Sequence, residues 1–230
     1  MKYKNIYPAT FISRPNRFIA TVEINGTTET VHVKNTGRCR ELLIPGVKVI
    51  LEKSDNPTRK TLYDLVMVYK EGLGWVNIDS QMPNYLVKEW LMTKPELFAE
   101  LTFIKPEYKY GNSRVDFYME QDNKKILMEV KGVTLEREGI GYFPDAPTER
   151  GIKHIRELIK AQQSGYESYI AFVIQMNGIE EVRPNIDTHR EFGIALDEAL
   201  KAGVKILFLG CSIFKDEIKI NLCMEKKARP

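Results

Sequence analysis

Two carboxylates and a lysine are the residues of this chain whose types and spacing best suit catalysis. Asp116 lies in one run of alternating polar and apolar residues, and Glu129 and Lys131 lie in the next. Alternation with a period of two predicts β-strands, and the polar stretch 121–124 between the runs predicts a hairpin. Glu129 and Lys131 then project from one face, and Asp116 lies across from them on the neighbouring strand.

This arrangement suits a metal-assisted reaction. Two carboxylates at one point repel each other, so both stay ionised only beside a cation. Oxygen ligands are those that Mg²⁺ or Mn²⁺ prefers, and both ions also accept phosphate oxygens. A lysine beside the metal could orient or help to deprotonate a water molecule, or offset charge on phosphorus. The implied reaction is hydrolysis of a phosphodiester.

A plainer interpretation is a Glu and a Lys on the solvated face of a hairpin. The pattern Glu-x-Lys also occurs at three other places: Glu107/Lys109, Glu217/Lys219 and Glu225/Lys227. The copy at Glu129 is distinguished by Asp116 on the preceding strand and by the apolar run that leads into it.

The bulk properties predict an ordinary globular protein with one large domain or two modest ones in its 230 residues. The longest apolar runs are too short to cross a bilayer, and the first residues lack the apolar segment of a signal peptide, so we expect a cytoplasmic protein without a membrane partner. The net charge is +3, but residues 1–80 hold 12 Lys and Arg against 8 Asp and Glu. This basic first third mildly favours a polyanionic partner.

Residues 1–80 are expected to form an OB-like barrel. Alternating runs near residues 18–24, 31–33, 47–51, 62–68 and 75–78 predict five short strands, and Asn25-Gly26 is a strong hairpin signal. Barrels of this type often bind oligonucleotides, although a fold alone does not establish a function.

Basic residues fall in the connections of this barrel. Gathered on one rim they could bind phosphates, although each taken singly is as readily a solvated loop charge. They are Arg14, Arg17, Lys34, Arg38, Arg40, Arg59 and Lys60.

Residues 81–230 alternate between helical and strand patterns. A helix is expected from Leu86 to Leu91, and residues 136–143 are expected to form a loop. Thr148 is a plausible N-cap for a helix whose first turns bear Arg150, Lys153 and His154, and such a basic helix start could hold a phosphate.

Of these helix residues, His154 is expected to be a side chain at a packing edge. The stretches 168–176 and 204–209 predict buried strands, and Thr188-x-x-Glu191 predicts a capping box for the helix between them. Gln175 lies at the end of the first of these strands. Its side chain either points into the site or is an ordinary amide at a strand end.

Asp116 and Glu129-x-Lys131, set in this order of elements, resemble the core of the PD-(D/E)xK nuclease superfamily. The stretches VHVKNTGRCRELLIPG, VNIDSQMPN, EVKGVTL and FPDAPTERG resemble the sugar fermentation stimulation protein A family over nearly the whole chain. The resemblance implies an α/β (α+β) protein with an N-terminal OB-like domain (1–80), a C-terminal nuclease-like mixed sheet flanked by helices (81–230), and DNA binding. It also implies Asp116 and Glu129 as metal ligands, with Lys131 as the third motif member, and adds the Val130 carbonyl and, less securely, Glu107.

Three hypotheses follow for the function. The first is a DNA-binding protein that holds Mg²⁺ or Mn²⁺ and hydrolyses phosphodiesters, with Asp116, Glu129 and Lys131 as the catalytic set. The second is a DNA-binding regulator of sugar (maltose) metabolism genes that has no turnover, and the third is an interaction protein with no nucleic-acid role. RNA remains open as a partner, and the sequence does not indicate the oligomeric state.

Overall fold

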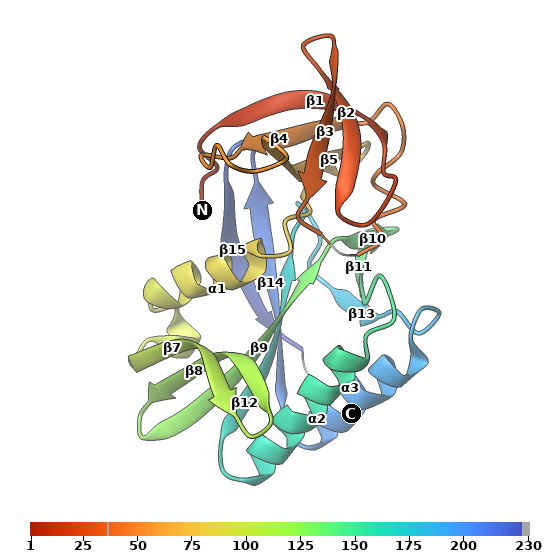
Figure 1. Cartoon of the computed structure of the whole chain (residues 1–230). Coiled ribbons are helices and arrows are strands. Elements are labelled where there is room, and N and C mark those ends of the chain that lie inside the picture. Colours follow the sequence, from red (N-terminus) through yellow and green to blue (C-terminus); the bar gives the residue numbers. More distant parts are fainter. Residues whose placement is uncertain (36, 227–230) are drawn as a thin grey trace.

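The first part of the chain forms a closed barrel of five strands in the computed structural model, which describes residues 1–35 and 37–226. The strands are β1 (Ile6–Ser13), β2 (Ile19–Ile24), β3 (Thr27–Val33), β4 (Lys48–Lys53) and β5 (Tyr63–Lys70). Their order is β3-β2-β1-β4-β5, and a parallel pairing of β3 with β5 closes the ring. The predicted OB-like barrel is therefore confirmed (Figure 1).

The five strands that form the barrel are not the five that were predicted. β1 was not predicted, because Pro8 interrupts its apolar alternation, yet Pro8 pairs in register with Ile50 of β4. The strand predicted at 75–78 is β6 (Gly74–Asn77), which continues the sheet from β5 and lies outside the ring. The hairpin at Asn25-Gly26 is confirmed, since both residues have positive φ, as a tight two-residue turn requires.

The second part of the chain is built on a six-stranded mixed sheet. Its strands are β7 (Leu101–Tyr110), β8 (Ser113–Gln121), β9 (Lys124–Val133), β12 (Glu167–Ile174), β14 (Lys205–Ile213) and β15 (Ile218–Glu225). The order is β15-β14-β12-β9-β8-β7, with β9, β12 and β14 parallel to one another. β12 lies at the centre and is buried along nearly its whole length, as its continuous apolar run predicts.

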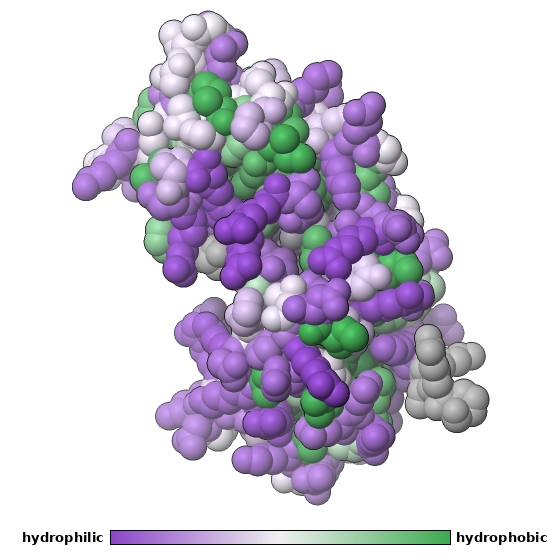
Figure 2. All heavy atoms as spheres, turned by 90° about the vertical axis from the view of Figure 1, so that its right-hand side faces the viewer, coloured by the Kyte–Doolittle hydropathy of each residue, from purple (hydrophilic) through white to green (hydrophobic). Residues whose placement is uncertain are grey.

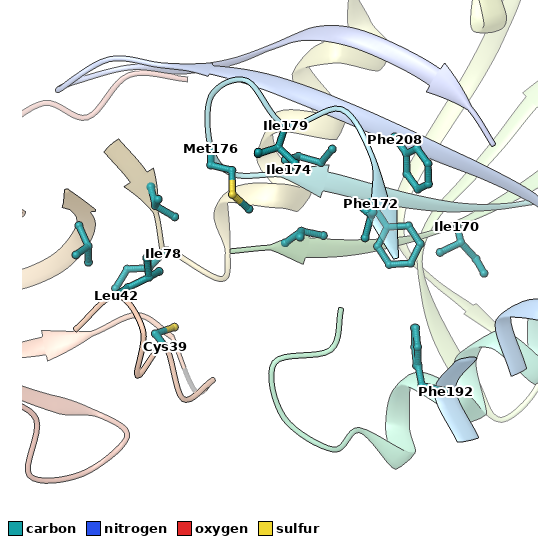
Figure 3. Close-up of a cluster of buried hydrophobic side chains, with 14 of the residues drawn as sticks. Cys39, Leu42, Ile78, Ile170, Phe172, Ile174, Met176, Ile179, Phe192 and Phe208 are labelled. Carbon is teal, nitrogen blue, oxygen red and sulfur yellow. The ribbon is translucent and has the colours of Figure 1, made fainter. Parts of the chain in front are cut away.

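Helices cover both faces of this sheet (Figure 1). α1 (Met82–Met92) packs on one face against β9 and β15, and α2 (Glu149–Gln163) and α3 (Arg190–Lys201) pack on the other. Phe192 of α3 lies in the apolar cluster beneath these helices with Phe172 and Phe208 of the sheet (Figure 3). The expected mixed sheet flanked by helices is thus present.

Of the two helix caps predicted for α2 and α3, one is present and the other is not. Thr148 caps α2 as predicted, and its hydroxyl accepts a hydrogen bond of 3.0 Å from the Gly151 amide. The predicted capping box at Thr188 is wrong, because α3 has His189 at its N-cap with no side-chain cap. The Thr188 amide instead donates to the Asn185 carbonyl in the preceding turn.

The loop predicted at 136–143 is instead a small hairpin. Its strands are β10 (Leu135–Arg137) and β11 (Ile140–Phe143), and β13 (Val182–Pro184) adds to β11 in parallel. Glu138 and Gly139 both have positive φ and form the turn. The partner strand lies some forty residues further on, so no local pattern reveals the pairing.

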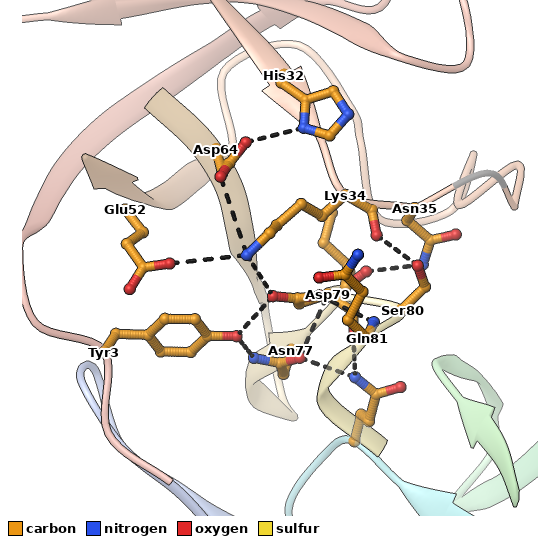
Figure 4. A network of polar contacts seen from close by, with 12 residues as sticks. Tyr3, His32, Lys34, Asn35, Glu52, Asp64, Asn77, Asp79, Ser80 and Gln81 are labelled. Atoms are coloured by element: carbon orange, nitrogen blue, oxygen red, sulfur yellow. Dashed lines mark hydrogen bonds and ion pairs between the residues drawn. The ribbon is translucent and has the colours of Figure 1, made fainter. Parts of the chain in front are cut away.

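A buried polar network joins the barrel to the second sheet (Figure 4). The Lys34 ammonium lies 3.0 Å from Asp79, 3.7 Å from Glu52 and 3.9 Å from Asp64. Burial alone would lower the pKa of Lys34, but the three carboxylates, Asp79 foremost, raise it above its ordinary value. Lys34 thus neutralises a cluster of acidic groups under the barrel.

The first residues of the chain also reach the second sheet. The Tyr3 amide donates to the Asp216 carbonyl at 2.8 Å, and the Ile218 amide donates to the Met1 carbonyl at 3.0 Å. Lys2 forms a bridge with Glu217 between these bonds. The segment before β1 is therefore held on the turn between β14 and β15.

Replacing Lys34 by Ala should lower the free energy of unfolding by about 3 kcal/mol, because Asp79 and Glu52 lose their cation, whereas Asp64 keeps Arg59. Urea unfolding measures the loss. The matched control is Lys2→Ala, which removes an exposed ion pair with Asp216 and should change stability by less than about 1 kcal/mol. Equal stability of the two variants would show that Lys34 does not hold the junction.

Candidate metal and nucleic-acid site

Asp116 lies where two strands of the large sheet part. β8 pairs with β9 from Gln121↔Lys124 to Phe117↔Met128, and no pair follows. One oxygen of Asp116, Oδ2, accepts a hydrogen bond of 2.7 Å from the Val130 amide of β9. The other, Oδ1, accepts one of 2.8 Å from the side chain of Asn84 on α1. Asp116 therefore fills the gap between the strands and links them to α1.

Glu129 is almost completely buried, with 2 % of its surface exposed. Its Oε1 lies 2.5 Å from the Lys131 ammonium and within hydrogen-bonding distance of His154 Nδ1 on α2. Its Oε2 is equally buried but has no hydrogen-bond partner among the described residues. One oxygen of this carboxylate is thus held by two partners, and the other has none among the described residues.

The two carboxylates have pKa values shifted in opposite directions. Burial, with a further contribution from Glu129, raises the pKa of Asp116 above its ordinary value. Burial would also raise the pKa of Glu129, but Lys131 and His154 more than offset it and hold that pKa below the ordinary value. Glu129 is therefore the carboxylate that stays charged, and Asp116 is the one that a further cation would stabilise most.

The donors present fit a hard divalent cation. The amide and carbonyl of Val130 leave the same edge of β9, toward Asp116, where no strand pairs with them. The Asp116 and Glu129 carboxylates and this carbonyl offer oxygen only, which suits Mg²⁺ or Mn²⁺ with water completing the shell. Within residues 1–35 and 37–226, no three His, Cys, Asp or Glu side chains gather closely enough to bind a metal by themselves.

Glu107 stands apart from the two carboxylates. In the β7–β8 register it falls between Pro106↔Phe117 and Tyr108↔Val115, and so opposite Asp116. It has φ +52° and a largely exposed side chain, 3.5 Å from Arg114. Glu107 and Asp116 line one cavity of about 570 Å³, so Glu107 shares the approach to the site without contacting Asp116.

Arginines from two barrel loops line a cavity of about 720 Å³. The side chains of Arg17, Arg38 and Arg40 are exposed and form no ion pair with any described residue. The Arg17 guanidinium lies 5.8 Å from the ring centre of Phe18, which is 53 % exposed. We call this the arginine cavity; Ala146 and Pro147, which lead into α2, form its other wall.

Three other basic residues predicted on this rim have partners inside the protein. The Arg14 guanidinium donates to four backbone carbonyls, among them those of Gly37 and Asn35. Arg59 makes two hydrogen bonds to Asp64, of 2.9 and 2.6 Å. Lys34 belongs to the junction network described above. These side chains organise the barrel and are poorly placed to bind a ligand.

The remaining basic candidates are exposed. Lys60 lies at the far end of its loop without an ion pair to any described residue. Arg150 donates to His154 Nε2 at 3.4 Å, and Lys153 donates to the Asn112 carbonyl at 3.4 Å. Arg150 and His154 therefore connect the exposed start of α2 with the buried Glu129.

The sequence reasoning missed two residues of the site. His154, assigned to a packing edge, contacts Glu129 directly, and Asn84 contacts Asp116. The signal for His154 is its place between Ile152 and Ile155 on the apolar face of α2, where a polar side chain needs a partner. Gln175 does not point toward Asp116 or Glu129; it bonds to Asn77 and Asp79 at the domain junction.

The face that bears the β10–β11 hairpin is mostly hydrophilic where the barrel meets the second sheet, with hydrophobic side chains showing on the barrel (Figure 2).

Among the described residues, no helix is long and apolar enough to cross a membrane.

Comparison with known proteins gives consistent matches along the chain. Residues 12–78 match the family description "SfsA N-terminal OB domain", and residues 81–217 match "Sugar fermentation stimulation protein RE domain". A sugar fermentation stimulation protein homolog of Desulfitobacterium hafniense (strain DSM 10664 / DCB-2) is 57 % identical over 219 residues, 95 % of each chain. One of Clostridium beijerinckii is 54 % identical over 221 residues, covering 96 % of this chain and 97 % of the relative.

A solved structure is also similar over almost the whole chain. It is that of Pyrococcus furiosus SfsA in complex with Ca²⁺, with 28 % identity and a TM-score of 0.89. The match covers 97 % of this chain and 96 % of that one. The predicted resemblance and the predicted fold class are both confirmed.

Replacing His154 by Leu should lower the free energy of unfolding by about 2 kcal/mol, because the buried Glu129 carboxylate loses a hydrogen-bond donor. Arg156→Leu, on the exposed side of the same helix, is the control and should change stability by about 0.5 kcal/mol or less. Chemical denaturation of both variants makes the comparison. If His154→Leu is as stable as the control, the contact with Glu129 contributes nothing to the fold.

Proposed function

Because this chain belongs to the sugar fermentation stimulation protein family, we propose that it binds DNA and hydrolyses phosphodiester bonds at a divalent-metal site formed by Asp116 and Glu129. The observation that carries this proposal is the buried Glu129 Oε2, which has no hydrogen-bond donor among the described residues, beside the half-buried Asp116. A lone buried carboxylate oxygen is costly, and a bound cation removes that cost.

The relative crystallised with Ca²⁺ supports a cation in the family. Ca²⁺ and Mg²⁺ are both hard ions that take oxygen ligands. In this chain the ligands would be Asp116, Glu129 and the Val130 carbonyl, and Glu107 lines the same cavity as Asp116. Bound there, the metal would polarise a phosphoryl oxygen and acidify a water molecule.

The surrounding side chains each have a definite task. Asn84 and the Val130 amide orient Asp116, and His154 orients Glu129. Lys131, 2.5 Å from Glu129, brings a positive charge to the point where negative charge grows on the phosphate. Its ammonium also keeps Glu129 ionised.

The exposed arginines give the nucleic acid a path to this site. Arg17, Arg38 and Arg40 surround a cavity whose far wall leads into α2, and the start of α2 bears Arg150 and Lys153. Phosphates bound along this track position a strand without reading its sequence.

A second candidate function is DNA binding without turnover, as a regulator of sugar (maltose) metabolism genes. The relatives' name refers to a physiological effect rather than a reaction. The contact between Lys131 and Glu129 also favours it, since an ammonium held by a carboxylate is less available to a substrate. Cleavage separates the two functions.

Titration of the wild type with Mg²⁺ or Mn²⁺ by calorimetry should show one site, lost in Asp116→Asn and in Glu129→Gln. On the same samples, labelled single- and double-stranded DNA should be cut by the wild type only. Lys131→Ala should keep the metal and lose about a hundredfold or more of the cleavage rate. The control is Asp122→Asn, a carboxylate at the tip of the β8–β9 hairpin with φ +49°, where Asn is well tolerated.

Each result bears on a different part of the proposal. Metal binding without cleavage of either DNA would favour the regulator. Equal metal binding in Asp116→Asn and the wild type would rule out the assigned ligands.

DNA affinity should fall with salt, and replacing Arg17 or Arg38 by Ala should reduce the slope of log K against log salt by about one each. Replacing Arg14 or Arg59 by Met should leave the slope unchanged, because their guanidinium groups already have partners in the protein. Fluorescence anisotropy at several salt concentrations measures the slopes. Identical slopes in all four variants would show that the DNA does not bind at the arginine cavity.

A further inference from the structure

A second, smaller cavity of about 210 Å³ lies between the barrel and the large sheet. It is next to the end of β9, beyond Lys131. The described residues on its walls that matter here are Gly37, Gly132, Thr134, Tyr142, Asp145 and Gln175. Neither the metal ligands nor the exposed arginines line it.

Two acceptor oxygens in this cavity have no donor. Gln175 is 1 % exposed, and its amide nitrogen donates to Asn77 Oδ1 at 2.8 Å and to the Asp79 carbonyl at 3.1 Å. Those two bonds fix the amide orientation, so Oε1 faces the other way, toward Gly132. No described residue donates to Oε1.

Asp145 contributes the second acceptor. Its Oδ2 accepts a hydrogen bond of 2.9 Å from the Arg38 amide, and no described residue donates to its Oδ1. The amide oxygen of a buried side chain and a carboxylate with one unpaired oxygen line one small cavity, and together they suit a ligand that donates hydrogen bonds.

One glycine packs closely against each of these two side chains. A Cβ at Gly132 would come within 2.4 Å of Gln175 Oε1, and a Cβ at Gly37 within 2.2 Å of Asp145 Oδ2. Any side chain at either position would collide with an acceptor. The Gly132 backbone thus packs against Gln175 Oε1, and the Gly37 backbone packs against the Asp145 oxygen that accepts from the Arg38 amide, which leaves Oδ1 free of both.

The small cavity adjoins the arginine cavity. Gly37 lines both, and Asp145 in one is followed directly by Ala146 and Pro147 in the other. The three arginines of the arginine cavity, which form no ion pair with any described residue, suit a phosphate. Gln175 Oε1 and Asp145 Oδ1 in the adjoining small cavity suit a ring that donates hydrogen bonds. In a nucleotide the phosphate and the base are joined through the sugar, so the two groups can occupy two adjoining cavities.

We infer that the two cavities together bind one unpaired nucleotide, with its phosphate among the arginines and an amino-bearing base in the small cavity. This rests on the proposed nucleic-acid binding and adds the form of the ligand. The exocyclic amino group of cytosine or adenine donates to Gln175 Oε1 and Asp145 Oδ1, whereas thymine has a single ring N–H donor between two carbonyl oxygens that these acceptors repel. A base can enter only when it is out of the duplex, so the site selects single-stranded or extruded nucleotides.

Fluorescence anisotropy of labelled single-stranded oligo-dC, oligo-dA and oligo-dT tests this inference. The wild type should bind dC and dA at least about tenfold more tightly than dT, the discrimination expected of a good pair of base contacts. Asp145→Asn keeps an oxygen for the Arg38 amide and turns an NH₂ toward the cavity. It should therefore reduce the preference for dC over dT by fivefold or more.

The matched control is Asp187→Asn, an exposed carboxylate (side chain 81 % exposed) in the turn before α3, which should leave the preference unchanged. Circular dichroism and urea unfolding establish that both variants are folded. Displacement of oligo-dC by free dCMP but not by dTMP would support the same cavity and show that a single nucleotide suffices. Displacement by neither, with the dC preference intact, would support a nucleotide held within a strand.

Two results would overturn the inference, and they can be told apart. Equal binding of dC and dT, or an unchanged preference in Asp145→Asn, would remove the base site while leaving DNA binding in place. Failure of every oligonucleotide to bind would remove the base site together with the proposed function.

Discussion

The hydrogen bond between Asp116 and the Val130 amide is the contact on which the site depends. Where β8 leaves β9, the freed amide of β9 is inside the protein and needs an acceptor. A carboxylate takes the place of the missing strand, so a charged group is built into the sheet itself. Removal of Asp116 from solvent raises its pKa above the ordinary value, although the hydrogen bond from the Val130 amide acts in the opposite direction. The sheet continues undisturbed on the other side of β9, where β12 and β14 keep Glu129 in a rigid frame.

Much of the fold could be predicted because its strongest elements carry their own signals. β12 is a continuous apolar run because it is buried on both faces, and the β2–β3 turn has the one dipeptide that best suits its geometry. The elements that were missed depend on distant partners. β1 contains a proline, β10 and β11 are short, and β13 pairs far along the chain, so only tertiary contacts define them.

The site was predictable to the extent that strand geometry places residues. Period-two alternation puts Glu129 and Lys131 on one face and Asp116 across from them, and the structure brings the three together. Local pattern could not show that Arg14 and Arg59 are engaged by carbonyls and by Asp64, since those partners come from other loops. Nor could it show that His154 reaches Glu129, because that contact joins a helix to a strand twenty-five residues earlier.

The attachment of residues 1–3 to the turn at 216–218 has a consequence for how the molecule assembles. Nearly the whole chain lies between these two segments, so the contact has a very high sequence separation, and contacts of this kind form late in folding. On the ribosome the barrel strands emerge first, yet the backbone hydrogen bonds of Met1 and Tyr3 to residues 216–218 can form only once the β14–β15 turn has been made. The contact that joins residues 1–3 to the second sheet therefore forms only after the last hairpin of that sheet.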